Sequence, residues 1–556
     1  MKKLKDIFLL FAGALVIVSC NKQVTADQVN PNNTTSVTPQ LILGTVLTSM
    51  SGLSGSGGTG SLGGIQSWDY VQQWNQYHCQ NFSYSGNNIY SWGQGTHTDQ
   101  VANTAAGPFN SYLVLKNEQQ MEAQVNSRGG AKVNPYEAIG RFVKAYYYYN
   151  TTSLMGDVPL TQALGNTSTP SYTPQEQVFA YVLNQLDSAN NDLATLVANN
   201  DNSLAAGGAA QDIYYSGNLA KWQKLVNAFT LRVLISLSLK ASDATLNVAG
   251  RFSNIINNPG KYPLFASQAD DFAFVYNPGG TNTYSIYPLN PVAYGGNATK
   301  VNMADTYVST MTSLNDPRVF ITCDPAWGLP GLNPSNPAQF KYFVGASTGL
   351  DLGTMSTNAT AGLYANINRK RYYSTYNGDP DVLVGYKEML FNIAEAIERG
   401  WIGGSAETYY KTGIIESFKF YGLDVTQTNF TAYFLPANAN NLTKIAPYPF
   451  TFSWANYYAQ STVQLSSTPA VAINQIVLQK YIAMFENSGY EAYYNWRRTG
   501  VPAFEGGTGV GNNGVIPIRW TYPTSEQTQN TANWNAALQN QGFGADDVNQ
   551  KMWLLK

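Results

Sequence analysis

Residues Ile476–Pro502 read IVLQKYIAMFENSGYEAYYNWRRTGVP. Apolar residues recur at helical spacing through the first part of this stretch, beginning just before it at Ile473. The members of this apolar face are Ile473, Ile476, Val477, Tyr481 and Met484, with the stem of Lys480 able to cover apolar surface. The pattern predicts a long amphipathic helix near the C-terminal end of the chain.

The same spacing continues outward from this stretch and predicts a mostly α-helical protein. The expected helices cover residues 41–50, 109–127, 135–154, 179–197, 222–237, 243–257, 383–399 and 405–421. Pro174 is placed to open the helix over 179–197. Between about 258 and 382, and again over 423–470, Pro, Gly and Asn interrupt the pattern. We expect long irregular excursions there with short strands at most, and such insertions often carry function.

The N-terminus has the layout of a bacterial lipoprotein signal. Lys2, Lys3 and Lys5 precede an apolar run, Ile7–Val18, that is too short for an ordinary membrane-spanning helix. The run ends at Cys20 in a sequence similar to a lipobox, although a plain secretory signal with a chance cysteine is the alternative. We expect residues 1–19 to be the signal peptide and residues 20–40 a lipidated polar tether. The lipid would be the attachment to the membrane.

Composition removes several classes of function. The chain has a net charge of -2, so it offers no basic field for nucleic acid. It has two histidines, His78 and His97, which argues against Ser-His-Asp chemistry and His-rich metal sites. The glycines between Gly55 and Gly60 match a dinucleotide fingerprint in letters but follow a helix, so a flexible loop is the better interpretation. We expect no cofactor.

Two smaller features have competing interpretations. Asp379, Asp381 and Glu388 are carboxylates that calcium prefers, but a turn followed by a helix start explains them better, and we predict no metal site. Cys79 and Cys323 are either a disulfide or two buried free thiols, and we favour the free thiols.

An aromatic and amide-rich cluster lies between residues 68 and 92. Flat aromatic faces cover the apolar face of a sugar ring, and side-chain amides pair with hydroxyls. The candidate ligand-binding residues are Trp68, Trp74, Tyr77, Tyr90 and Trp92. The alternative for each is packing in an aromatic core helix. Core packing is also the interpretation for the run Tyr146–Tyr149, whose rings point in different directions on a helix.

Several stretches together resemble the SusD/RagB family of nutrient-binding outer-membrane lipoproteins, in its SusD-like branch. The resembling segments, in order, are Gly156–Leu160 (GDVPL), Leu225–Leu237 (LVNAFTLRVLISL), Asn315–Arg318 (NDPR), Ala394–Trp401 (AEAIERGW) and the Ile476–Pro502 stretch. This stretch has Tyr493 where the family commonly has Trp, and Asn495 where it commonly has Asp. The resemblance covers nearly the whole chain after the signal peptide.

The resemblance implies a SusD-like helical fold, with tetratricopeptide-like helix pairs and a loop-rich ligand-binding portion in a single domain over 41–556. It implies a non-catalytic protein, lipid-anchored on the exterior face of the outer membrane. Such a protein binds an oligosaccharide or peptide and delivers it to a TonB-dependent, SusC-like barrel. We expect structural roles for the residues of its motifs, which are Asp157, Pro159, Asp316, Arg318, Trp496, Arg497 and Arg498.

Two other classes of function stand against this expectation. A lipid-anchored hydrolase of the same polymers would need a pair of carboxylates that only folding brings together. A structural lipoprotein of the cell envelope would need neither ligand nor turnover. Nothing in the sequence singles out a catalytic pair.

Overall fold

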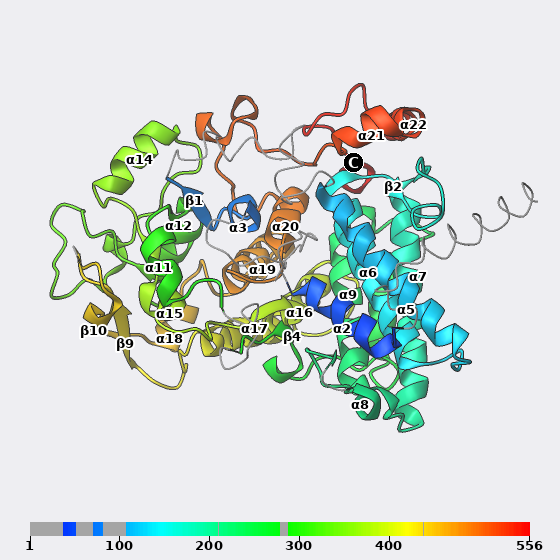
Figure 1. Cartoon of the computed structure of the whole chain (residues 1–556). Coiled ribbons are helices and arrows are strands. Elements are labelled where there is room, and N and C mark those ends of the chain that lie inside the picture. Colours follow the sequence, from blue (N-terminus) through cyan, green and yellow to red (C-terminus); the bar gives the residue numbers. More distant parts are fainter. Residues whose placement is uncertain (1–36, 52–69, 82–106, 209–210, 278–286, 438) are drawn as a thin grey trace, which may run out of the picture.

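The computed structural model describes residues 37–51, 70–81, 107–208, 211–277, 287–437 and 439–556 (Figure 1). Trp68, Tyr90 and Trp92, together with the Gly55–Gly60 loop and the segment around Cys20, lie outside these ranges. No helix within the described ranges combines the length and the apolar character needed to cross a bilayer.

Long helices fill the N-terminal half and pack against one another side by side (Figure 1). The helices of this group are α2 (Pro39–Met50), α5 (Ser111–Ser127), α6 (Pro135–Met155), α7 (Gln175–Ala198), α9 (Leu219–Ser236) and α10 (Val248–Asn257), with the shorter α8 (Ser203–Gly208). Helix α3 (Tyr70–Trp74) is short and lies apart from this group (Figure 1). Helix α6 begins where the side chain of Asn134 accepts a hydrogen bond from the Glu137 N–H at 2.9 Å, with Pro135 at the first helical position. Pro174 stands at the N-cap of α7, as predicted.

Aromatic side chains form much of the core between these helices. Tyr146, Tyr147, Tyr148 and Tyr149 are all buried, which confirms their interpretation as core residues. Their rings reach different neighbours, because successive residues of a helix point about 100° apart. The Tyr149 hydroxyl, for example, crosses to α20 and donates to the Glu491 carboxylate at 2.8 Å.

The C-terminal half contributes a second group of helices, of which α16 (Tyr386–Glu398), α19 (Pro469–Ala483) and α20 (Glu491–Thr499) lie at the centre of the molecule (Figure 1). The others are α17 (Ala406–Phe420), α18 (Trp454–Tyr458), α21 (Thr524–Gln529) and α22 (Thr531–Gln541), the last two at the upper right of the picture. Helix α16 packs against α9, α17 and α19, so it connects the two groups. The mostly helical fold predicted from the sequence is confirmed.

The region between 258 and 382 differs from its prediction, because it contains helices as well as strands. They are α11 (Pro291–Asn297), α12 (Asp305–Ser313), α13 (Val319–Thr322), α14 (Leu352–Thr360) and α15 (Arg369–Tyr373). Helices this short leave no periodic apolar pattern to detect. Their signals are caps instead. The Asn290 side chain caps α11 with Pro291 at the first helical position, and the Asp351 side chain caps α14.

Short antiparallel strand pairs connect the helices in the described part of the chain. The pairs are β1 (His78–Gln80) with β5 (Val301–Met303), β2 (Val158–Pro159) with β3 (Tyr172–Thr173), β4 (Phe272–Phe274) with β8 (Asp381–Val384), β6 (Cys323–Asp324) with β7 (Asn366–Ile367), and β9 (Asn429–Phe434) with β10 (Ala446–Thr451). The prediction of a helix over 383–399 was wrong at its start. The helix begins only at Tyr386, because the preceding residues form strand β8. A short buried apolar run fits either element, and pairing with β4 decides for the strand.

Cys79 in β1 and Cys323 in β6 are buried thiols that form no disulfide with each other, as favoured from the sequence. They contribute to different apolar clusters of the core.

Buried ion pairs join the central helices to one another. The Arg232 guanidinium of α9 donates to both oxygens of the Glu388 carboxylate in α16, at 2.7 and 2.5 Å. The Arg498 guanidinium of α20 pairs with Glu395, also in α16. Between them, the Lys480 ammonium of α19 donates to the Asn392 amide oxygen at 2.7 Å. These charged side chains are almost fully buried, so each depends on its partner.

Glu395 gives a direct test of this network. Burial pushes the pKa of Glu395 upward, but Arg498 and Arg399 outweigh burial and hold it at about 2. Because folding lowers this pKa, the stabilising contribution is complete above the ordinary value of 4.5 and is lost as the pH falls toward 2. We expect Glu395→Gln to lower the free energy of unfolding at pH 7 by about 3–5 kcal/mol, measured by urea denaturation.

The loss should be smaller at pH 3, where the wild-type protein has already lost part of the contribution. Glu398→Gln, one turn along α16 at a partly exposed carboxylate, is the matched control and should change stability by less than about 0.5 kcal/mol. Equal losses for the two variants would contradict the role of the network.

Candidate ligand-binding site

Helix α15 carries three consecutive cationic residues and lies among three pockets. Asn368 caps the helix, its side-chain oxygen accepting from the Arg371 N–H at 2.8 Å. Arg369 lines one pocket, Lys370 lines a second, and Arg371 lines the second and a third. We name the pocket lined by Arg369 the Trp327 pocket, the one lined by Lys370 and Arg371 the Lys370 pocket, and the third, also lined by Arg371, the Asp379 pocket.

The Trp327 pocket has a volume of about 400 Å³ and is formed by α11, the end of α14, β6, β7, α15 and the chain after β9. Its lining residues are Tyr294, Thr299, Asp324, Trp327, Gly328, Thr360, Ala361, Gly362, Asn366, Arg369, Leu435, Pro436, Ala437 and Ala439. Helices α11, α14 and α15, which contribute lining residues, lie in the left half of Figure 1.

A buried carboxylate and guanidinium lie together in the Trp327 pocket. Asp324 and Arg369 form an ion pair at 3.5 Å, and the Asn368 amide donates to the other Asp324 oxygen at 3.0 Å. A second Arg369 nitrogen donates to the Ala298 carbonyl at 3.1 Å. Burial raises the pKa of Asp324 to about 7, and Arg369 opposes part of that rise. These groups have fixed positions from which they can exchange hydrogen bonds with a polar ligand.

Two half-buried aromatic side chains accompany these polar groups. The Tyr294 ring meets Tyr373 edge-on, with centroids 5.7 Å apart, and the Trp327 ring lies 6.4 Å from the ring of Tyr448. Partial exposure leaves ring surface for a ligand to cover. Aromatic surface beside a few fixed polar groups is the usual composition of small-molecule sites, and it suits a sugar ring with hydroxyls at its edge.

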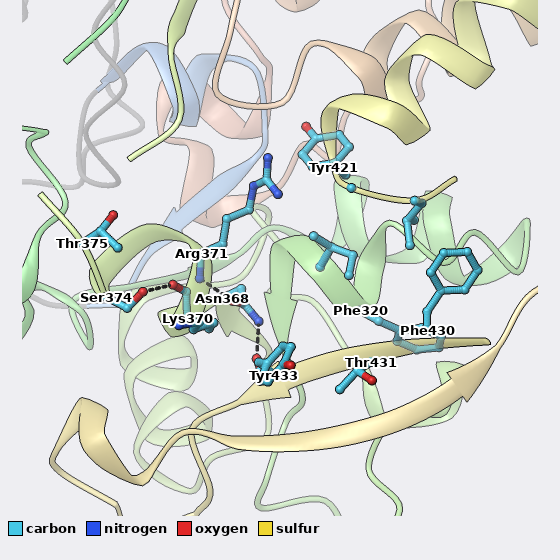
Figure 2. A pocket seen from close by; sticks show the side chains of 13 residues that line it. Phe320, Asn368, Lys370, Arg371, Ser374, Thr375, Tyr421, Phe430, Thr431 and Tyr433 are labelled. Atoms are coloured by element: carbon cyan, nitrogen blue, oxygen red, sulfur yellow. Dashed lines mark hydrogen bonds between the residues drawn. The ribbon is translucent and has the colours of Figure 1, made fainter. Parts of the chain in front are cut away.

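The Lys370 pocket, drawn in Figure 2, lies on the other side of Asn368 and has a volume of about 420 Å³. The Asn368 amide donates to the Tyr433 carbonyl at 3.0 Å and so fixes β9 against α15. Lys370, Arg371 and hydroxyl residues line this pocket, and its lining residues include no carboxylate. Its aromatic members are Phe320 and Tyr421, which are buried, and Phe430 and Tyr433 on β9.

The Asp379 pocket, of about 520 Å³, is lined by paired charges. The Arg371 guanidinium donates to the Asp379 carboxylate at 2.6 Å. Asp271 accepts from the Tyr386 N–H at 2.6 Å, and burial raises its pKa to about 7. Of the three, the Trp327 pocket alone combines an indole ring with both a carboxylate and a guanidinium, so it is the candidate ligand site.

Neither of the two described residues predicted to bind ligand, Trp74 and Tyr77, lines this pocket. Trp74 and Tyr77 are 0% exposed. Trp74 packs between Tyr493 and Trp520, with centroids at 4.8 and 5.3 Å, and Tyr77 stacks on Tyr481 at 4.6 Å. This burial disagrees with a ligand-binding role for Trp74 and Tyr77, because neither ring offers a face to a ligand. Trp68, Tyr90 and Trp92 lie outside the described residues.

The motif residues make contacts between segments that are distant in sequence. Asp157 caps α7 by accepting from the Gln175 N–H at 2.9 Å, and the Pro159 carbonyl accepts from the Tyr112 hydroxyl at 2.6 Å. Arg318 is fully buried, and its guanidinium donates to Asp316, Ser417 and Gln479 at 2.5–2.9 Å.

The motif of α20 continues this pattern. The Trp496 ring stacks on Phe504 with centroids 4.9 Å apart. Arg497 donates to the Ser153 and Ile518 carbonyls at 2.8 and 2.9 Å, and Arg498 is the partner of Glu395. These side chains therefore tie helices and loops together.

The three carboxylates considered as calcium ligands have other positions and contacts in the structure. Asp379 pairs with Arg371, Glu388 pairs with Arg232, and Asp381 belongs to β8. Within the described residues, no group of three or more His, Cys, Asp and Glu side chains is arranged to hold a metal ion.

The sequence interpretation did not identify Tyr294, Asp324, Trp327 or Arg369. All four lie in the proline-rich region that the sequence left without regular structure. A tryptophan among Pro, Gly and Asn, as in Asp324–Gly328 (DPAWG), was the available signal, because loops on rigid scaffolds often carry binding residues.

Gly328 allows two backbone segments of the pocket wall to approach each other closely. Its N–H donates to the Gly362 carbonyl at 2.8 Å, and a Cβ at Gly328 would lie 1.9 Å from the Ala361 carbonyl oxygen. We expect Gly328→Ala to lower the free energy of unfolding by about 1–3 kcal/mol in urea denaturation, because the backbone must move. Gly260→Ala, where a Cβ meets nothing within 4 Å, is the matched control. A Gly328→Ala protein as stable as the control would refute this tight approach.

Comparison with known proteins gives the family. Residues 31–523 match the family SusD-like_2, described as starch-binding and associating with the outer membrane. Two SusD homologues from Bacteroides fragilis have similar structures. One is 29% identical with a TM-score of 0.71, the other 26% identical with a TM-score of 0.72, and each comparison covers 94% of this chain and 100% of the other.

A chitin-binding SusD homologue from Flavobacterium johnsoniae shares the fold, at 19% identity and a TM-score of 0.67 over 92% of this chain and 98% of its own. Curated protein sequences gave no match. With the family matched over residues 31–523 and the same fold in solved homologues, the chain belongs to the SusD-like family.

Proposed function

We propose that this protein captures a glycan in the Trp327 pocket and delivers it to an outer-membrane transporter. The observation that carries the proposal is the combination, in a SusD-like protein, of half-buried Trp327 and Tyr294 with the Asp324–Arg369 pair in one pocket. An oligosaccharide suits this composition better than a peptide, because a flat indole face matches the apolar face of a pyranose ring.

Each group in the pocket has a part in binding. Trp327 and Tyr294 cover ring faces of the sugar. The Asp324 carboxylate accepts hydrogen bonds from sugar hydroxyls, while Arg369 and the Asn366 amide donate to sugar oxygens. The Asn302 amide already donates to the Asn366 side-chain oxygen at 3.1 Å, which directs the Asn366 NH₂ group away from Asn302.

Binding without turnover is the better account of these residues. Glycoside hydrolysis ordinarily uses two carboxyl groups on either side of the scissile bond. The described lining of the Trp327 pocket offers one, Asp324, and that carboxylate is held by Arg369 and Asn368. We therefore assign the protein a non-catalytic role.

Membrane attachment and delivery complete the proposal. Cleavage before Cys20 and acylation of its thiol would anchor the chain, with residues 20–40 as the tether. The anchored protein would face the cell exterior and cover a TonB-dependent, SusC-like barrel. Hinged opening would then release the glycan into the barrel. The family's description as associating with the outer membrane supports this placement.

Truncating the indole tests the binding site. We expect Trp327→Ala to weaken binding of a glycan ligand by on the order of 1–3 kcal/mol, roughly 5- to 150-fold in Kd, because the stacking surface is lost. Isothermal titration calorimetry with maltohexaose, cellohexaose and the hexamer of N-acetylglucosamine would measure it.

Tyr433→Ala, at the exposed ring beside the Lys370 pocket, is the comparison variant and should bind as the wild type does. A loss confined to Tyr433→Ala would move the site to the Lys370 pocket. Unchanged affinity in both variants would exclude both pockets.

A pull-down tests delivery separately. We expect tagged protein from native outer membranes in mild detergent to recover a large TonB-dependent barrel at a near one-to-one ratio, identified by mass spectrometry. Cys20→Ser removes the acylation site, so that variant should leave the membrane fraction. Recovery of the wild-type lipoprotein alone would contradict the partnership.

A further inference from the structure

Two residues that line the Trp327 pocket each carry a buried donor that has no acceptor in the described part of the protein. They are the indole Nε1–H of Trp327 and the Nε–H of Arg369. The other Arg369 nitrogens are engaged, with Asp324, Ile367 and Ala298. A buried donor without an acceptor costs about 1–3 kcal/mol, so two in one pocket require a physical reason. A ligand that brings an acceptor into the pocket supplies one.

The charges of the pocket favour a neutral acceptor. Asp324 and Arg369 neutralise each other, and the lining contains no second Lys or Arg. A ligand carboxylate or sulfate would therefore lie close to the Asp324 carboxylate without an unpaired cation to compensate. A carbonyl oxygen accepts two hydrogen bonds without that cost.

One part of the pocket wall is apolar. Ala361, Leu435, Pro436 and Ala437 line it on the segments that follow α14 and β9. A methyl group buried against such a wall contributes about 0.8 kcal/mol. A sugar hydroxyl there would gain no hydrogen bond from these side chains.

We propose that the Trp327 pocket selects sugars that carry an acetamido group. The acetamido carbonyl accepts from Trp327 Nε1–H and Arg369 Nε–H, and the acetamido methyl packs against the apolar wall. The pyranose ring lies on the exposed surface of Trp327 and Tyr294. This inference rests on the proposed glycan-binding role and narrows its ligand to N-acetylated amino sugars.

Matched oligosaccharides test the inference. The hexamer of N-acetylglucosamine and cellohexaose share β-1,4 linkages and differ at C2, where an acetamido group replaces a hydroxyl. Calorimetric titration of the mature wild-type protein should give at least a 10-fold lower Kd for the acetylated hexamer, because a hydroxyl leaves the donors unpaired. Maltohexaose, the starch-type glucan, should bind no better than cellohexaose.

Trp327→Phe keeps an aromatic face and removes only the indole N–H. We expect it to weaken binding of the acetylated hexamer about 5- to 10-fold more than it weakens binding of cellohexaose, so that the preference for the acetylated hexamer narrows. Tyr294→Phe is the matched control, because it removes a hydroxyl outside the acetamido contacts and should preserve the ratio of the two affinities.

The outcomes distinguish a failure of the acetamido selection from a failure of the proposed glycan binding. Equal or tighter binding of either glucose hexamer overturns the acetamido selection and leaves glycan binding standing. Preference for an N-acetylated peptide over all three hexamers overturns the sugar assignment. No binding of any hexamer removes the proposed function together with the inference. An unchanged preference in Trp327→Phe excludes the indole donor as its source.

Discussion

Buried charge holds this fold together. Arg232 and Arg498 reach α16 from α9 and α20, and the carboxylates they meet, Glu388 and Glu395, lie two helical turns apart on α16. Removing one partner of such a pair leaves a charge in an environment that cannot solvate it, so the helices must keep their register. Arg232 also donates to the Leu383 carbonyl of β8 at 2.7 Å. The network therefore extends to the segment between α15 and α16, close to the pockets.

The sequence was most informative where residues repeat with the period of a helix. The long helices α6, α7, α9 and α19 were predicted because each must bury one apolar face, and that requirement is visible in a single chain. The same stretch, Ile476–Pro502, supplies Lys480, whose stem was expected to cover apolar surface, and Arg498, whose motif suggested a structural role. Neither pattern revealed the partners of these side chains. The partners lie about 90–100 residues away, at Asn392 and Glu395. Only folding brings such pairs together.

The candidate site was beyond what periodicity reveals. Trp74 and Tyr77 belong to a segment with the composition of a sugar site, but both side chains lie in the core. An aromatic ring that stacks on a ligand and one that stacks on Tyr481, as Tyr77 does, give the same pattern in the sequence. Asp324 and Arg369 are 45 residues apart and meet only because β6 pairs with β7. Their pocket belongs to a region whose prolines were interpreted as interruptions. One of them, Pro291, instead begins α11, the helix that carries Tyr294.

The scaffold and the pocket give one account. Buried ion pairs fix the central helices, and short capped helices and strand pairs build a polar and aromatic pocket. We propose that this pocket receives a sugar. A crystal structure of the mature protein soaked with the N-acetylglucosamine hexamer tests this account most directly. The account predicts a sugar ring against Trp327 and Tyr294 with its acetamido group toward Arg369. Density for the hexamer in the Lys370 or Asp379 pocket, with the Trp327 pocket unchanged, would contradict it.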